Sequence, residues 1–75
     1  MQILLPKLGF SMNEARLVEW LHADGARVEV GQPLYSLESD KAIEEIPAPC
    51  SGVLRVVAPA GETYTVGTVI GEITP

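Results

Sequence analysis

The stretch GARVEVGQPLYSL, residues 25–37, returns 36 positions later (61 − 25) as GETYTVGTVIGEI, residues 61–73. The shift places glycine on glycine and apolar residue on apolar residue: Gly25 on Gly61, Val30 on Val66, Gly31 on Gly67, Leu34 on Ile70 and Leu37 on Ile73. Polar and apolar residues alternate in RVEV and in TYTV, which is the pattern of half-buried strands. Neither copy could bury its own apolar face, so the repeat predicts two halves that pack together.

The residues upstream of each copy decide between helix and strand. Read alone, SMNEARLVEWLH (residues 11–22) is compatible with a helix, because Ser11 and Glu14 have capping-box spacing. The same shift extends the repeat to Leu17 on Val53, Val18 on Leu54, Trp20 on Val56 and Leu21 on Val57. The second copy, GVLRVV, is rich in β-branched residues. We therefore predict a strand over Leu17–His22, with Trp20 in the core.

Glycines and prolines are spread along the whole chain, so we expect short strands joined by tight turns, as at Asp24–Gly25 and Ala60–Gly61. We predict an all-β single domain over residues 1–75, with about eight strands in two four-stranded antiparallel sheets. These would pack as a flattened barrel or sandwich with a pseudo-two-fold axis relating residues 5–40 to 41–75. Applied in either direction, the 36-residue shift maps Lys41 onto Leu5 or onto a position just past Pro75, which are both close to a terminus. Because the pseudo-two-fold axis relates these positions, we expect Lys41 and the termini at opposite ends of the domain.

Composition excludes several classes of function. The 75 residues leave little room for an enclosed active site. A formal net charge of −5 argues against a nucleic-acid partner. A single cysteine, Cys50, and a single histidine, His22, exclude an internal disulfide and a Cys/His zinc site. The start MQILLPK predicts neither a signal peptide nor a membrane span, so we expect a cytoplasmic protein.

The run ESDKA, residues 38–42, lies at the joint of the two halves and resembles the attachment site of the lipoyl domains of 2-oxo acid dehydrogenase complexes. LPKLGFSMNEARLVEW (5–20) resembles the family's first strand, exposed loop and second strand, and IPAPCSGVLRVV (46–57) also follows its pattern. The family places glycines sixteen residues before the modified lysine and eleven after it, and Gly25 and Gly52 occupy those positions.

The resemblance implies a barrel-sandwich hybrid fold and lipoate attached through an amide to Lys41. It implies a carrier domain that is not an enzyme by itself and that is part of a dihydrolipoamide acyltransferase or a partner to one. The implied partners are a thiamine-diphosphate decarboxylase, the acyltransferase core, a flavin dihydrolipoyl dehydrogenase and lipoate-attaching enzymes, with the domain itself monomeric. If the chain is eukaryotic and already processed, we expect it in the mitochondrial matrix instead of the cytoplasm. Recognition is expected around the turn, at Glu38, Asp40 and Ala42 and along the loop Leu8, Gly9, Phe10, Ser11, Met12, Asn13 and Glu14. Gly25, Gly52 and Gly61 are expected to serve structural turns, and no metal is expected.

Two alternatives remain open from the residues. In a biotinyl carrier domain methionines flank the target lysine, whereas Asp40 and Ala42 flank Lys41 here. An unmodified structural module of the same fold would lack a lysine at the tip of this hairpin. The sequence leaves open which 2-oxo acid, or acetoin, feeds the complex, and whether the domain is free or part of a larger acyltransferase.

Overall fold

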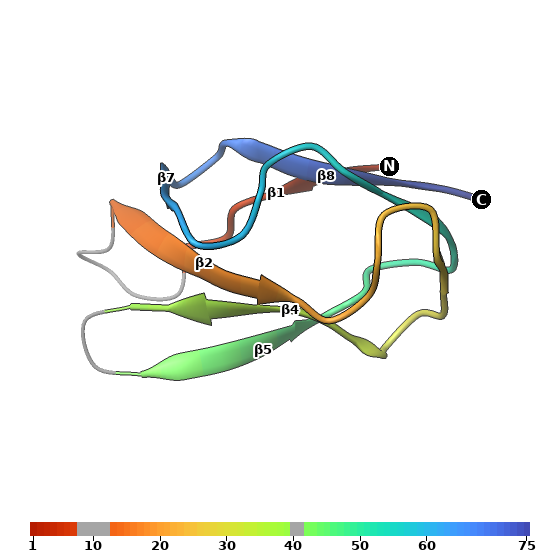
Figure 1. Ribbon diagram of the computed structural model, residues 1–75, viewed down its shortest axis with the longest axis horizontal. Helices are drawn as coiled ribbons and strands as arrows, with labels where there is room; N and C mark the ends of the chain where they lie inside the picture. The colour runs from red at the N-terminus through yellow and green to blue at the C-terminus, as the bar shows by residue number, and fades with distance from the viewer. Residues whose placement is uncertain (8–12, 40–41) are drawn as a thin grey trace.

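The computed structural model describes residues 1–7, 13–39 and 42–75, and the described residues form eight strands and no helix (Figure 1). The strands are β1 (Gln2–Leu4), β2 (Glu14–Trp20), β3 (Arg27–Val28), β4 (Pro33–Glu38), β5 (Ile43–Pro47), β6 (Gly52–Val56), β7 (Thr63–Thr65) and β8 (Val69–Thr74). The helical alternative for residues 11–22 is therefore excluded over its described part. Since no helix occurs, the described residues include none that could cross a membrane.

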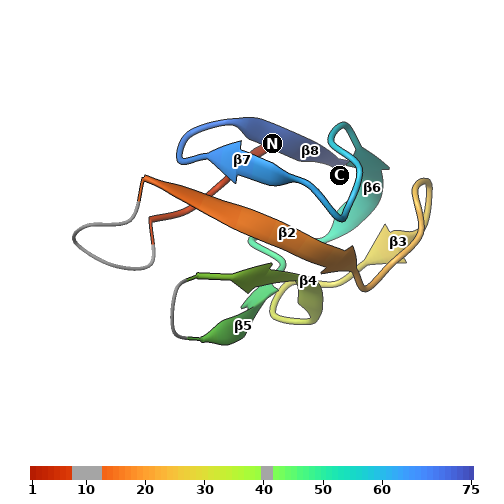
Figure 2. The same cartoon turned by 60° about the vertical axis from the view of Figure 1, so that its left-hand side comes forward.

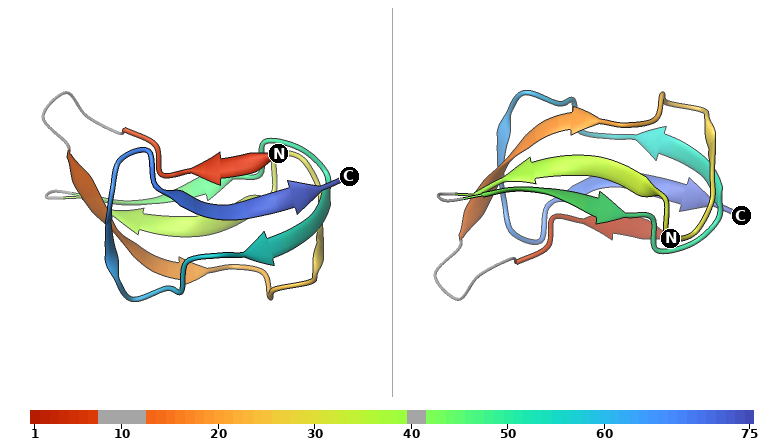
Figure 3. Two further views of the ribbon diagram at one scale, coloured as in Figure 1. Left: turned by 90° about the horizontal axis from the view of Figure 1, so that it is seen from above. Right: turned by 90° about the horizontal axis from the view of Figure 1, so that it is seen from below.

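Two four-stranded antiparallel sheets make up the domain, with strand orders β1-β8-β6-β3 and β5-β4-β2-β7. Figures 2 and 3 show the sheets as two layers, and in Figure 3 most of the strands run roughly along the long axis of the molecule. This confirms the predicted pair of four-stranded sheets. Each sheet keeps two edge strands, so the layers form a sandwich and the described strands do not close into a barrel.

The core lies between the layers and follows from alternation along the strands. Ala15 and Leu17 of β2 are buried, whereas Glu14, Arg16 and Glu19 are exposed. The largest fully buried side chains are Tyr35, Leu5, Leu17, Leu34, Leu37, Leu54, Ile70, Ile73 and Val28. They come from both halves of the repeat, which explains why one half alone has no core.

Trp20 is half-buried and packs against this core instead of lying within it. Its indole Nε1 donates a hydrogen bond to the carbonyl of Ala58 at 2.9 Å, and its ring lies 5.2 Å from that of Tyr35, centroid to centroid. An indole N–H needs an acceptor, so the ring takes a position at the margin of the core where one is available.

The predicted strand over Leu17–His22 is shifted in the structure, since β2 starts at Glu14 and ends at Trp20. Leu21 still donates its amide to the carbonyl of Leu34 at 2.9 Å, but His22 lies in a bend. The RVEV segment also pairs over a shorter length than its pattern suggests, because only Arg27 and Val28 lie in β3.

Backbone hydrogen bonds at the two glycine turns show the pseudo-two-fold symmetry. Gly25 donates its amide to the carbonyl of Leu54, and Gly61 donates to the carbonyl of Leu17, both at 2.7 Å. Leu17 and Leu54 are therefore structural equivalents, and both are fully buried. They are separated by 37 residues (54 − 17), whereas the glycines are separated by 36 (61 − 25).

A β-bulge at Val18 accounts for the extra residue. In the β2–β4 ladder Leu17 faces Leu37 and Glu19 faces Ser36, so Val18 has no partner in that ladder. The corresponding residues Leu54 and Arg55 of β6 pair with β8 without interruption. The predicted superposition of Leu17 on Val53 and Val18 on Leu54 is therefore wrong by one residue, whereas Trp20 on Val56 holds beyond the bulge.

The predicted equivalence of Lys41 and Leu5 is also wrong. Leu5 donates its amide to the carbonyl of Thr68 at 2.9 Å, and Ala48 makes the equivalent bond to Gln32 at 2.8 Å. Leu5 therefore corresponds to Ala48, and the joint between the halves corresponds to the gap between the two termini. The described ends of the β4–β5 hairpin do lie at one end of the long axis and both termini at the other (Figures 1 and 3).

Candidate functional site at the β4–β5 hairpin

The hairpin formed by β4 and β5 contains the predicted attachment site at its closed end. Glu38, the last residue of β4, faces Ile43, the first residue of β5. Beyond this pair, Ser39 donates its backbone amide to the carbonyl of Ala42 at 2.9 Å, and its hydroxyl lies 3.4 Å from the same oxygen. Asp40 and Lys41 follow Ser39 in the chain and lie outside the described residues.

A straight row of register partners crosses the whole sheet next to this turn. Thr63 of β7 faces Arg16 of β2, Arg16 faces Glu38, and Glu38 faces Ile43. Directly opposed residues of an antiparallel pair have side chains on the same face of the sheet. The row therefore places an arginine and a glutamate side by side on the outer face, at the base of the hairpin end.

An open groove of about 700 Å³ runs along this row. Its described lining comes from the starts of β2 and β7 and from both sides of the hairpin end: Glu14, Ala15, Arg16, Glu38, Ser39, Ala42, Ile43 and Thr63. The hairpin end is exposed, since Ala42 is exposed and Ile43 retains 61% of its accessible surface. A group joined to the chain between Ser39 and Ala42 would border both the groove and solvent.

The predicted recognition loop lies only partly within the described residues. Leu8, Gly9, Phe10, Ser11 and Met12 lie outside them. Asn13 is exposed and accepts a hydrogen bond through its carbonyl from the amide of Val66 at 2.9 Å. Glu14 starts β2 and lines the groove beside the hairpin. The described end of the loop therefore belongs to the same site as Glu38 and Ala42.

The three glycines of the predicted site serve two different purposes. Gly25 and Gly61 lie in turns with φ values of 87° and 94°, the left-handed region in which a side chain is strained. The expectation of a turn is wrong for Gly52, which begins β6. A Cβ at Gly52 would overlap the carbonyl of Thr74 and lie 2.8 Å from Cγ2 of Ile73, so glycine is needed for close packing against β8.

Arg16, Ile43 and Thr63 belong to the groove but were not predicted as site residues. Their nearness to Glu38 depends on the register between strands distant in sequence, which alternation along one strand does not reveal. The bulge at Val18 makes that register harder to derive. The described residues contain no cluster of three or more His, Cys, Asp or Glu side chains able to hold a metal ion.

Comparisons with known proteins identify relatives of the whole fold. The family model for biotin and lipoyl attachment, described as "Biotin-requiring enzyme", matches residues 1–73. The dihydrolipoyllysine-residue succinyltransferase of the 2-oxoglutarate dehydrogenase complex of Bacillus subtilis is 41% identical over 96% of this chain and 18% of its own length. The acetyltransferase of the pyruvate dehydrogenase complex of Corynebacterium glutamicum is 40% identical over 92% of this chain and 10% of its own.

A related acetyltransferase of the acetoin cleaving system of Cupriavidus necator is 38% identical over 97% of this chain and 20% of its own. The chain thus spans no more than about a fifth of these relatives. Among solved structures, the lipoyl domain of the 2-oxoglutarate dehydrogenase complex of Azotobacter vinelandii superposes with a TM-score of 0.83 at 25% identity, covering 100% of this chain and 96% of that one. The chain therefore belongs to the biotin and lipoyl attachment family, as a lipoyl domain of the kind found in dihydrolipoyllysine acyltransferases.

Proposed function

We propose that Lys41 carries lipoate in amide linkage and that the domain moves acyl groups and reducing equivalents between the active sites of a 2-oxo acid or acetoin dehydrogenase complex. Membership of the family supports a carrier, and its lipoyl-domain relatives favour lipoate over biotin. The single observation that carries the proposal is that the described ends of the β4–β5 hairpin, Ser39 and the exposed Ala42, lie at the opposite end of the molecule from the termini.

The described residues fit a lipoyl group attached covalently to a lysine side chain, which together form a long flexible arm. Ala42 is small and exposed, and a backbone hydrogen bond joins Ser39 to Ala42 at the described end of the hairpin. When bound, lipoate supplies a dithiolane that accepts acyl groups and electrons, a chemistry that the protein's own side chains do not offer. The contribution of the protein is the position of the arm and its recognition.

Tethering explains why a separate carrier is useful. A group held on a domain reaches each partner site at an effective concentration set by the tether, far above that of the free cofactor. We propose three partners in turn: a thiamine-diphosphate decarboxylase that acylates the arm, an acyltransferase that removes the acyl group, and a flavin dihydrolipoyl dehydrogenase that reoxidises the dithiol. A lipoate-attaching enzyme would act before them.

Substitution of the proposed attachment residue tests the assignment directly. The chain contains only two lysines, Lys41 and Lys7, so Lys41→Arg and Lys7→Arg form a matched pair. Arginine keeps the charge, but its guanidinium is far less nucleophilic than the amine of lysine at neutral pH. We expect Lys41→Arg to fold normally and to gain no lipoyl mass after co-expression with a lipoate-attaching enzyme, whereas Lys7→Arg is modified like the wild type.

Intact mass spectrometry reads out the result. A lipoyl increment on Lys41→Arg would move the site to another residue, and a biotinyl increment on the wild type would favour the biotinyl alternative. Failure of any such enzyme to modify the folded wild type would instead support an unmodified structural module.

The substrate class requires a second experiment. The relatives serve complexes for pyruvate, 2-oxoglutarate and acetoin, so a panel of decarboxylase components should be assayed for reductive acylation of the lipoylated domain. We propose a pyruvate-type or acetoin complex, because LPKLGFSMNEARLVEW resembles the carriers of those systems. A highest kcat/KM with a 2-oxoglutarate component would contradict that preference.

A further inference from the structure

Asp24 is followed by Gly25 in the turn between β2 and β3, and it is the only aspartate or asparagine of the chain that precedes a glycine. Glycine has no Cβ to hinder its amide nitrogen, so this nitrogen can attack the side chain of a preceding aspartate. We propose that Asp24–Gly25 is a site of spontaneous covalent modification, the formation of isoaspartate, and that the fold controls its rate through two hydrogen bonds to β6. The inference goes beyond the proposed carrier function and does not depend on it.

The modification proceeds in two steps, and water is its only co-reactant. The amide nitrogen of Gly25 attacks Cγ of Asp24 and forms a C–N bond, while the amide proton and a carboxyl OH leave together as water. The cyclic succinimide is then hydrolysed at one of its two carbonyls. One opening restores aspartate, and the other gives isoaspartate, in which the main chain runs through Cγ.

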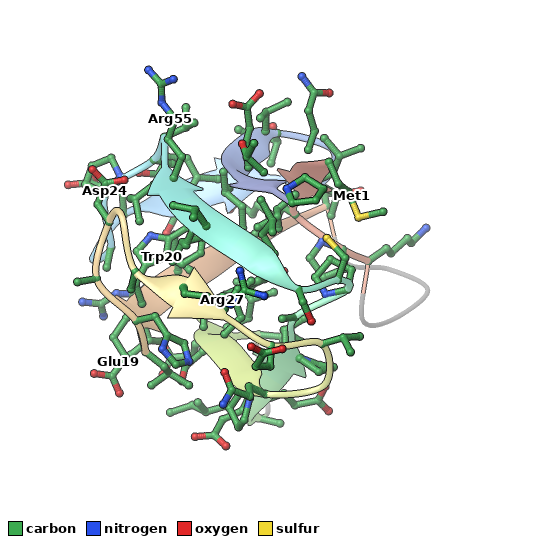
Figure 4. All side chains as sticks on the ribbon, turned by 90° about the vertical axis from the view of Figure 1, so that its right-hand side faces the viewer. Met1, Glu19, Trp20, Asp24, Arg27 and Arg55 are labelled. Carbon is green, nitrogen blue, oxygen red and sulfur yellow. The ribbon has the colours of Figure 1, made fainter. Side chains whose placement is uncertain are left out.

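Burial does not protect this pair of residues. Asp24 and Gly25 are both exposed, and Figure 4 shows Asp24 at the rim of the molecule, in the loop that leads into β3. Apart from its chain neighbours, no heavy atom lies within 4 Å of the place that a Cβ would take at Gly25, so crowding does not prevent ring closure either. Protection in the folded chain must therefore come from hydrogen bonds.

The first hydrogen bond engages the attacking nitrogen. The amide of Gly25 donates to the carbonyl of Leu54 at 2.7 Å, and Leu54 in turn donates its amide to the carbonyl of Ala26 at 2.8 Å. This reciprocal pair of bonds joins the turn to β6, and Leu54 itself is fully buried. The nitrogen of Gly25 cannot give up its proton and move toward Asp24 until its bond to Leu54 opens.

The second hydrogen bond engages the carboxyl group. Oδ1 of Asp24 accepts the amide of Val56 at 2.8 Å, two residues further along β6 than the acceptor of Gly25. The nitrogen and the carboxyl group that would react are thus held by different residues of the same strand. Because ring closure reorients the carboxyl group, the bond to Val56 has to break as well.

Modification therefore requires a local opening of the turn. Such openings occur in folded proteins with free energies that range from near zero up to that of global unfolding. When opening and closing are fast relative to the chemical step, the reaction rate falls in proportion to the fraction of time that the turn is open. The two bonds to β6 thus set how fast isoaspartate forms.

The product would not fit the turn as aspartate does. Isoaspartate lengthens the main chain between Asp24 and Gly25. The chain that follows is fixed in register on β6, where Arg27 faces Val53. Since β3 contains only two residues, it has little other pairing to hold it. The modification would therefore convert a transient opening of this sheet edge into a lasting one.

Ageing of the whole domain in folded and unfolded form tests the inference. The wild type is incubated at neutral pH without denaturant and in urea well above its unfolding midpoint. Its tryptic peptide of residues 17–27 is then analysed by electron-transfer fragmentation, which distinguishes isoaspartate from aspartate. We expect isoaspartate at residue 24 to accumulate at least about tenfold more slowly in the folded domain. Asp24→Glu is the matched control and should form no isoaspartate at this position in either condition, because closure of the larger ring is far slower.

Hydrogen exchange shows whether the bonds to β6 are the cause. We expect the amides of Gly25 and Val56 to exchange slowly in the folded domain by NMR, and the isoaspartate rate to rise together with the exchange rate of Gly25 as urea is added below the midpoint. Equal ageing of folded and unfolded wild type would overturn the inference, as would the absence of isoaspartate from the unfolded chain. Fast exchange of Gly25 combined with slow ageing would overturn the assigned cause. The test needs no lipoyl group, so a failure of the proposed function would leave its result unaffected.

Discussion

Gly52 and Gly25 both have positive φ values, 156° and 87°, but only Gly52 is also closely packed, and substitution by alanine separates these two requirements. At Gly52 the added Cβ would overlap backbone atoms of Thr74, whereas at Gly25 the space around it is open and only the φ of 87° opposes it. We expect Gly52→Ala to lower the free energy of unfolding by about 3 kcal/mol and Gly25→Ala by about 1–2 kcal/mol. Urea unfolding followed by Trp20 fluorescence measures both, and equal losses would contradict the packing argument.

Tyr35 is nearly inaccessible in the core, and desolvation raises the pKa of its phenol from 10.0 to about 12. In the unfolded chain the phenol ionises near pH 10, whereas the folded protein keeps it neutral. Its contribution to stability is therefore complete below pH 10 and is lost as the pH rises toward 12. We expect Tyr35→Phe to lose stability less steeply than the wild type over this interval.

Denaturant unfolding at a series of pH values from about 9 to 11 checks this expectation. A spectroscopic titration of the wild type should also show one of its two tyrosines ionising near pH 12. Parallel stability curves for Tyr35→Phe and the wild type would show that burial of the phenol has no such effect.

At the scale of single strands, deletion of Val18 tests whether this residue is the extra residue of the bulge in β2. Without Val18, Leu17 would still face Leu37 and Glu19 would still face Ser36, and β2 would pair as regularly as β6 does. We therefore expect deletion of Val18 to be tolerated at a cost of about 1–2 kcal/mol.

Deletion of Arg55 from β6 is the matched control. It removes one residue from a regular ladder, so Leu54 and the residues before it would have to change faces or open a break in the strand. Leu54 is fully buried, so we expect no cooperative unfolding transition in that variant by circular dichroism. Comparable stability of the two deletions would refute the assignment of Val18 as the extra residue.

The strands could be predicted from the sequence because the repeat compares two segments that must fold alike. GVLRVV identified its partner around Leu17 as a strand, although the local signals there favour a helix. The bulge at Val18 could not be predicted, because one unpaired residue leaves the apolar pattern almost unchanged and is defined only by the opposing strand. The groove shared by Arg16, Glu38 and Thr63 was missed for the same reason, since cross-strand register decides it.

At the scale of the molecule, the two halves are interleaved and should not fold separately. Four of the six strand ladders, β1–β8, β2–β7, β3–β6 and β4–β5, join a strand of the first half to one of the second. We expect peptides of residues 1–39 and 42–75 to be unfolded alone by circular dichroism, and the whole chain to unfold in one transition. A cooperative transition in either peptide would contradict this account.

The position of both termini at one end, and of the described hairpin ends at the other, also has a mechanical consequence. The molecule is 33 Å long but only 20 by 18 Å across. Any chain joined to either terminus would hold the domain as a rod hinged at its base, so a small rotation about the hinge would sweep the hairpin end through a wide arc. The body of the domain thus extends the reach of whatever its tip carries by nearly its own length.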